Sequence, residues 1–215
     1  MKKYNLLKSL PKSKRNIKKR ENVKTNFHID ISRKYGREYF DGDRSYGYGG
    51  YRYDGRWKPV AEDIIKYYSL KKGDKFLDIG CAKGFLVQDL LELGIDAYGV
   101  DVSEYAINSA PKKLQGRLHI CDAKKIYFPN KSFDVVVSIN TLHNLEKKDC
   151  LKAIQEIQRL SKKGSFIQVD SYLNEKQKKI FESWVLTAKY YDYTNKWIEL
   201  FRKAKYTGEY YWTII

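Results

Sequence analysis

Two aspartates and two glycines in one short stretch carry the clearest chemical signal of this sequence. Asp78 lies in an apolar run that leads into a turn with Gly80 and Gly84, and Asp101 ends a second apolar run seventeen residues beyond Gly84. Glycines let the backbone turn tightly and approach a ligand, and an acid after the second strand of a βαβ unit accepts hydrogen bonds from both ribose hydroxyls. The four residues therefore predict a site for a cofactor that contains a nucleoside.

The spacing of this turn distinguishes between cofactors. It reads D-x-G-x-x-x-G, whereas a dinucleotide site reads G-x-G-x-x-G and places pyrophosphate on the helix N-terminus. Asp78 would repel a pyrophosphate but suits a cationic ligand. With this turn the chain resembles the class I S-adenosylmethionine (SAM)-dependent methyltransferases, whose first motif is acid-x-Gly-x-Gly-x-Gly, although Ala82 replaces the middle glycine. The resemblance implies SAM as cofactor and S-adenosylhomocysteine (SAH) as product.

The same resemblance implies roles for residues that follow the next strands. The acid after strand two binds the ribose, an acid after strand three contacts the adenine, and the end of strand four lies near the reactive end of the cofactor. Cys81 lies inside the turn, where we interpret it as a small packing residue rather than a nucleophile. The expected cofactor-binding residues are Asp78, Gly80, Cys81, Ala82, Gly84, Asp101, Val102, Asp122, Ala123 and Asn140.

An alternation of strands and helices must position these residues. Apolar patterns predict strands at 75–79, 97–100, 117–120, 133–139 and 164–169, and helices from Pro59, at 84–93, 103–110 and 147–161. This order predicts an α/β fold with a Rossmann-like, doubly wound, mostly parallel sheet. In the tail we expect helices at 175–182 and 195–204 and strands at 185–191 and 210–214. The family resemblance implies that the last strand is antiparallel.

His143, in the segment NTLHNL after strand four, is the candidate catalytic base, with an orienting or packing role as the alternative. Residues 41–55 are rich in glycine, tyrosine and arginine and are expected to fold over the cofactor. We expect Tyr46, Tyr48, Arg52 and Arg56 to contact the acceptor. Arginine binds phosphate and carboxylate bidentately, so an anionic small-molecule acceptor is favoured. Alternatively, the tyrosines pack and the arginines face solvent.

A narrower resemblance points in the same direction. The runs RSYGYGGYRYDGRWKPVAE and LDIGCAKGFLVQDL are similar to bacterial methyltransferases found with surface-polysaccharide genes, including those proposed for O-methyl phosphoramidate decoration of capsules. This similarity implies capsule biosynthesis as the role and a phosphate-type oxygen as the acceptor. Such an oxygen is already ionised at neutral pH, so alignment and positive charge would suffice.

Composition sets the domain organisation. With 215 residues, 42% of them hydrophobic, we expect one catalytic domain at 56–215, preceded at 1–55 by a basic arm and a Gly/Tyr-rich cofactor lid. Residues 1–24 hold ten Lys and Arg against one acid, Glu21, within a net charge of +16, and are expected to stay outside the core. Three cysteines without metal-ligand spacing, no signal peptide and no membrane span predict a cytoplasmic protein without a metal.

Other classes of function stay open. An RNA methyltransferase could use the basic arm to follow the nucleic-acid backbone, and a noncatalytic protein could bind SAM without turnover. A nicotinamide dehydrogenase is disfavoured by Asp78 and the glycine spacing. The absence of an Asn-Pro-Pro-aromatic sequence makes amide and adenine amino acceptors less expected. The acceptor and the oligomeric state are not determined by the sequence.

Overall fold

The strands form a single parallel sheet. The computed structural model describes residues 1–11 and 17–214. Within them the strand order is β1-β7-β6-β5-β2-β3-β4, and each neighbouring pair is parallel. The strands are β1 (Lys2–Lys3), β2 (Lys75–Ile79), β3 (Asp96–Asp101), β4 (Leu118–Ile120), β5 (Phe133–Ile139), β6 (Ser161–Asp170) and β7 (Glu209–Thr213).

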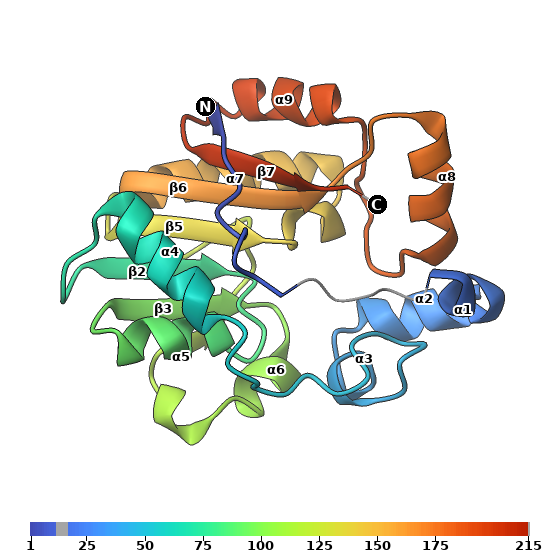
Figure 1. Ribbon diagram of the computed structural model, residues 1–215, viewed down its shortest axis with the longest axis horizontal. Helices are drawn as coiled ribbons and strands as arrows, with labels where there is room; N and C mark the ends of the chain where they lie inside the picture. The colour runs from blue at the N-terminus through green and yellow to red at the C-terminus, as the bar shows by residue number, and fades with distance from the viewer. Residues whose placement is uncertain (12–16, 215) are drawn as a thin grey trace.

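Helices cover both faces of this sheet (Figure 1). Alternate residues of each strand face opposite sides, so two apolar cores form. One packs β2, β5, β6 and β7 against α7 and α9, and the other packs the sheet against α4 and α5. The helices are α1 (Ile17–Val23), α2 (Asn26–Arg33), α3 (Arg37–Asp41), α4 (Lys58–Tyr68), α5 (Phe85–Glu92), α6 (Glu104–Asn108), α7 (Lys147–Leu160), α8 (Glu175–Trp184) and α9 (Thr194–Lys203), with 3₁₀ turns η1 (Lys112–Leu114) and η2 (Leu142–Asn144). The predicted Rossmann-like doubly wound fold is confirmed.

The expected antiparallel terminal strand is wrong. β7 runs parallel to β6, with Phe166 opposite Glu209 and Asp170 opposite Thr213. The reason lies in the long connection between them. α9 packs beside α7 on one face of the sheet and returns the chain to the edge where β6 begins, so β7 starts there and runs in the same direction.

The expectation that the basic N-terminal segment lies outside the core is also wrong for its first residues. Lys2 and Lys3 pair with Glu209 and Tyr210 at the edge of the sheet. The leucines at positions 6 and 7 are buried in the core on the α4 and α5 side. Two apolar residues among many lysines therefore suffice to dock the chain. The segment expected to be an arm, 1–24, includes positions 12–16, which lie outside the described residues.

The strand predicted at 185–191 does not form, although most of the segment is buried. Its backbone groups bond elsewhere: the amides of Lys189 and Tyr190 donate to the carbonyl of His143, and the carbonyl of Ala188 accepts from Arg33 at 2.9 Å. Among the described residues, no strand of the sheet pairs with this segment. Among the described residues, no helix is long and apolar enough to cross a membrane.

An N-terminal helical segment, residues 17–55, lies beyond the carboxyl ends of the strands (Figure 1). On one side α1 contacts α8, and Lys24 donates to the carbonyl of Glu182. On the other side α3 contacts α6, and the hydroxyl of Ser103 donates to the carbonyl of Tyr35 at 2.6 Å. The segment therefore bridges the two halves of the carboxyl edge of the sheet.

Candidate functional site

The turn between β2 and α5 has the backbone shape that its residues were expected to give. Gly80, Ala82 and Gly84 have φ angles of +84°, +51° and +74°. The amides of Gly80 and Cys81 both donate to the carbonyl of Val100, at 2.8 and 3.1 Å, which draws the turn against the end of β3. A Cβ at position 80 would overlap the side chain of Thr141. Ala82 adopts a left-handed conformation that disfavours alanine, so the turn keeps its glycine-type shape despite the substitution.

Asp101 holds this turn in place. One carboxylate oxygen accepts from the amide of Ala82 and the other from the amide of Ser103, both at 2.8 Å. Each oxygen has a second lone pair, so the carboxylate can still accept bonds from two ligand hydroxyls. Burial raises the pKa of Asp101, whereas the amide bonds act in the opposite direction. Its position beside the turn is the one that a ribose-binding acid requires.

Asp78 is the second acid at the turn, and its carboxyl is buried. Desolvation, reinforced by the negative charge of Asp101, raises the pKa of Asp78 to about 7. Two acids close together in a low-dielectric environment resist being ionised at the same time. A ligand with positive charge relieves this repulsion, which supports the predicted preference for a cationic ligand.

The ends of β3 and β4 present apolar surface. Asp101 and Ile120 are aligned in register on these strands. Val102 and Ile120 are both exposed large apolar side chains, a combination typical of a binding surface. Ile120 was not among the predicted site residues, although its place at the end of the third predicted strand was a usable signal. The carboxylate of Asp122, which was expected to contact adenine, accepts a hydrogen bond from the amide of Lys124 at 3.1 Å and forms an ion pair with the Lys124 ammonium. Ala123, next in the chain, is partly buried.

Cys81 packs inside the turn. The thiol is buried, and its sulfur would lie 2.6 Å from a Cβ placed on Gly99 of β3. Burial raises the pKa of Cys81 well above its usual value, so the thiolate is disfavoured. This geometry agrees with a packing role.

Asn140 and His143 follow β5 and lie beside the end of β6. The amide of Asn140 donates to the carbonyl of Gln168 at 2.8 Å. His143 is buried, with Nδ1 accepting from the amide of Asp170 at 3.1 Å and Nε2 lying 3.5 Å from a carboxylate oxygen of Asp170. An imidazole that accepts at Nδ1 carries its proton on Nε2 when neutral. The geometry thus favours a positioning role, and base catalysis by His143 stays a prediction.

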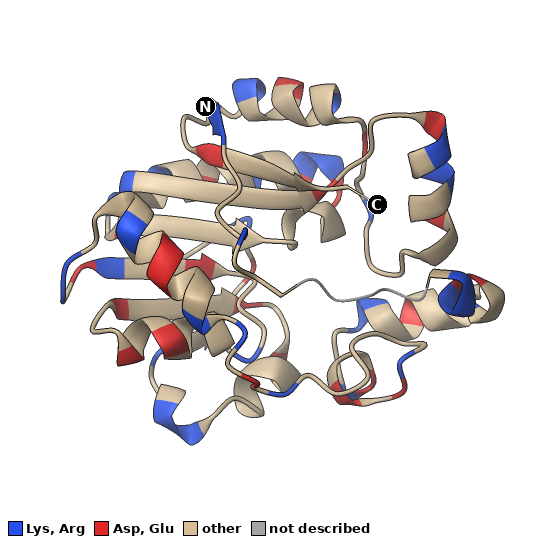
Figure 2. Cartoon of the chain, in the orientation of Figure 1, with Lys and Arg blue, Asp and Glu red and all other residues tan. Residues whose placement is uncertain are grey.

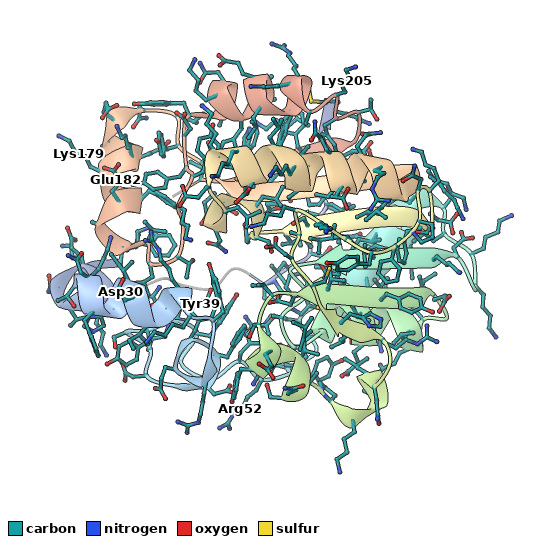
Figure 3. The ribbon with its side chains drawn as sticks, turned by 180° about the vertical axis from the view of Figure 1, so that it is seen from behind. Asp30, Tyr39, Arg52, Lys179, Glu182 and Lys205 are labelled. Atoms are coloured by element: carbon teal, nitrogen blue, oxygen red, sulfur yellow. The ribbon has the colours of Figure 1, made fainter. Side chains whose placement is uncertain are left out.

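The four residues expected to contact the acceptor have other partners or face solvent. Tyr46 stacks on His28 at 5.1 Å between ring centroids, and Tyr48 packs among the aromatic rings of the N-terminal helical segment. Arg56 forms an exposed ion pair with Asp54 at 2.5 Å. Arg52 is exposed and lies at the outer edge of the molecule (Figure 3). The alternative interpretation, packed tyrosines and solvent-facing arginines, describes these positions better.

An ion pair between the buried Lys83 and the partly buried Asp41 joins the N-terminal helical segment to the cofactor turn. The ammonium of Lys83 lies 2.5 Å from the carboxylate of Asp41, which also accepts from the hydroxyl of Tyr105 at 2.6 Å and the amide of Tyr51 at 3.0 Å. Burial raises the pKa of Asp41, but the bonds from Lys83 and Tyr105 outweigh it and hold the pKa below its usual value. Sequence reasoning missed this pair because no local pattern links residues so far apart.

A second contact places the same segment on α5, the helix that begins after Gly84. The ring of Tyr51 stacks on Phe85 at 4.9 Å, and the hydroxyl of Tyr53 donates to the carboxylate of Asp89 at 2.5 Å. Among the described residues, no group of three or more His, Cys, Asp and Glu side chains is arranged to hold a metal ion.

Comparison with known proteins supports the interpretation of this fold. Residues 77–169 match the methyltransferase domain family. An uncharacterized methyltransferase of Geobacillus sp. is 33% identical over 54% of this chain and 56% of its own length. One of Anoxybacillus flavithermus is 30% identical over 61% of this chain and 66% of its own length. The chain thus spans less than two thirds of either relative. A SAM-dependent methyltransferase structure from Methanosarcina mazei has the same fold, with 21% identity, a TM-score of 0.53, and coverage of 66% of this chain and 82% of that one. Residues 77–169 therefore resemble a methyltransferase domain, and the chain shares its fold with a SAM-dependent methyltransferase of known structure.

Proposed function

We propose that this protein transfers a methyl group from SAM to a small-molecule acceptor. The observation that carries the proposal is the cofactor turn held by the Asp101 carboxylate at the carboxyl edge of the sheet. Bound there, SAM supplies an electrophilic methyl group on a sulfonium sulfur. Asp101 would hold the ribose, and Val102 and Ile120 would flank the adenine. The missing Cβ of Gly80 lets the turn pack directly against Thr141 after β5.

A small acceptor is supported by the N-terminal helical segment. This segment contacts α6 and the cofactor turn on one side and α8 on the other, so it can act as a lid over the carboxyl edge. Such a lid excludes water and favours compact acceptors. An RNA methyltransferase is a weaker candidate, because lysines and arginines lie on α1, α4, α8 and α9 alike rather than only in the N-terminal segment (Figure 2).

The narrower expectation, a phosphate-type acceptor in capsule or surface-polysaccharide modification, depended on Arg52 and Arg56. Arg56 pairs with Asp54, and Arg52 is exposed. That acceptor class therefore rests only on the sequence similarity. A cytoplasmic location fits the three free thiols and forms part of the proposal.

Binding and transfer assays test the proposed function together. Calorimetry should show binding of SAM and SAH but not of NADH. Labelled methyl groups from SAM should then pass to members of a panel of small phosphates, carboxylates, alcohols and amines. Binding of NADH instead of SAM, or transfer to RNA but to no small compound, would contradict the proposal.

The pKa of Asp78 makes a prediction about pH. SAM carries one positive charge more than SAH, and an ionised Asp78 binds the more positive ligand better. Because the pKa of this acid is raised to about 7, the carboxylate forms as pH rises through that value. The ratio of SAM to SAH affinity should therefore increase by about tenfold between pH 6 and pH 8, from the change in ionised fraction alone. Calorimetry across this range measures it, and Asp78→Asn should give a flat profile; an unchanged slope in that variant would assign the titration to another group.

The role of His143 can be decided by two substitutions. Asparagine can place its Oδ1 where Nδ1 accepts the amide of Asp170 but cannot act as a base, whereas alanine removes both functions. We expect His143→Asn to retain turnover within about tenfold and His143→Ala to lose more, with the best acceptor of the panel. A loss of about 100-fold in both variants, with disappearance of a pH dependence near neutrality, would instead identify His143 as the base.

A further inference from the structure

A polar network lies at the carboxyl ends of three neighbouring strands. The side-chain amide of Gln168 donates to the hydroxyl of Thr213 at 3.0 Å, and that hydroxyl donates to Oδ1 of Asn140, also at 3.0 Å. Gln168 and Asp170 are two residues apart on β6, so they share one face of the sheet. The Asp170 carboxylate therefore lies on the same face of the sheet as this network, next to the end of β5 that Asn140 follows.

Two oxygens on this face have no hydrogen-bond donor in the described part of the chain: Oε1 of Gln168 and Oδ1 of Asp170. The two residues are only 8% and 5% exposed. Burying an acceptor without a partner is unfavourable, and burying a carboxylate is more so. Each buried unpaired acceptor in a native fold calls for an explanation, and a bound ligand that donates to it is one.

The Asp170 carboxylate has a single basic neighbour among the described ion pairs, and it is His143. The amide of Asp170 itself donates to Nδ1 of that ring, the arrangement of a neutral imidazole. A cationic hydrogen-bond donor would satisfy Oδ1 and compensate the buried charge at once.

We propose that Asp170 and Gln168 form the acceptor subsite and that the methyl acceptor is a small amine, its ammonium group bound at Asp170. A second hydrogen-bond donor of the same amine is then bound by Oε1 of Gln168. An anionic acceptor would face a buried carboxylate, and like charges at such a position repel strongly. The inference rests on the proposed methyltransferase function and names its substrate class.

The test uses the full chain saturated with SAH and two matched sets of probes. Tyramine, tyrosol and 4-hydroxyphenylacetate share one scaffold and carry an ammonium, a hydroxyl or a carboxylate, as do the smaller ethanolamine, ethylene glycol and glycolate. Calorimetry should show that in at least one set the amine binds at least tenfold more tightly than the acid. Equal binding within both sets, tighter binding of the acids, or no binding of any probe would overturn the inference.

Variants then assign the preference to the subsite. Asp170→Asn should lower amine affinity at least tenfold while leaving SAH affinity unchanged. Asp134→Asn is the matched control, because Asp134 is a buried acid at the amino end of β5, opposite to the carboxyl ends where Asp170 lies. Its carboxylate accepts from the amide of Lys75 and pairs with Lys163. If Asp170→Asn fails to fold, Gln168→Glu provides a second test, since an added carboxylate should raise the preference for amines. Unchanged amine affinity in the folded variants would contradict the assignment of the subsite. If the unmodified protein does not bind SAH, the proposed function itself is contradicted.

Discussion

Replacing Asp101 by alanine is expected to weaken binding of SAH by about 30- to 1,000-fold, equivalent to about 2–4 kcal/mol. The carboxylate accepts from the amides of Ala82 and Ser103 and has lone pairs left for two ribose hydroxyls. Its loss removes the ligand bonds and also releases the turn that positions them. Calorimetric titration with SAH measures the effect directly.

Asp96→Ala is the matched control for this substitution. Asp101 ends β3, whereas Asp96 begins it. The carboxylate of Asp96 pairs with Arg117 at the amino end of β3, away from the cofactor turn. SAH affinity should therefore stay unchanged in the control. Asp101→Asn should fall between the two, because an amide oxygen still accepts hydrogen bonds but carries no charge. Wild-type affinity in Asp101→Ala would refute the assignment of the cofactor site.

Replacing Leu6 by alanine is expected to lower the free energy of unfolding by about 2–5 kcal/mol. This side chain is only 1% exposed and belongs to the same apolar core as the buried faces of α4 and α5. The substitution removes buried apolar surface and leaves a cavity that close-packed neighbours fill only in part. Denaturant unfolding followed by circular dichroism gives the difference.

Leu173→Ala provides the control, since that leucine is 60% exposed and its truncation should change stability by less than about 0.5 kcal/mol. SAH binding at temperatures well below the transition should be unaffected in both variants. Equal stability of Leu6→Ala and the unmodified protein would mean that the first residues are peripheral, as their lysine-rich composition alone indicates.

The sequence by itself determined the shape of the turn after β2 and most of the sheet, and it predicted the residues of the cofactor site. The turn residues, Asp101 and the succession of strands and helices are encoded locally, because backbone turns need glycine-type conformations and apolar periodicity follows the repeat of each element. Even Ala82, where the motif departs from glycine, adopts a left-handed conformation. Short-range patterns suffice wherever the interacting residues are close in the chain.

Only the tertiary structure decided the direction of β7, the docking of Leu6 in the core, and the partners of the acceptor half. The pair of Lys83 with Asp41 and the approach of Asp170 to His143 join residues that are distant in sequence. Such contacts depend on how elements pack, and an isolated aspartate or histidine has the same local pattern whether it binds a ligand, a neighbour or water. Arg52 and Arg56 illustrate the converse. Their residue type suggested anion binding, but Arg52 faces solvent and Arg56 pairs with Asp54. Nothing in the local sequence specifies which way a loop side chain points.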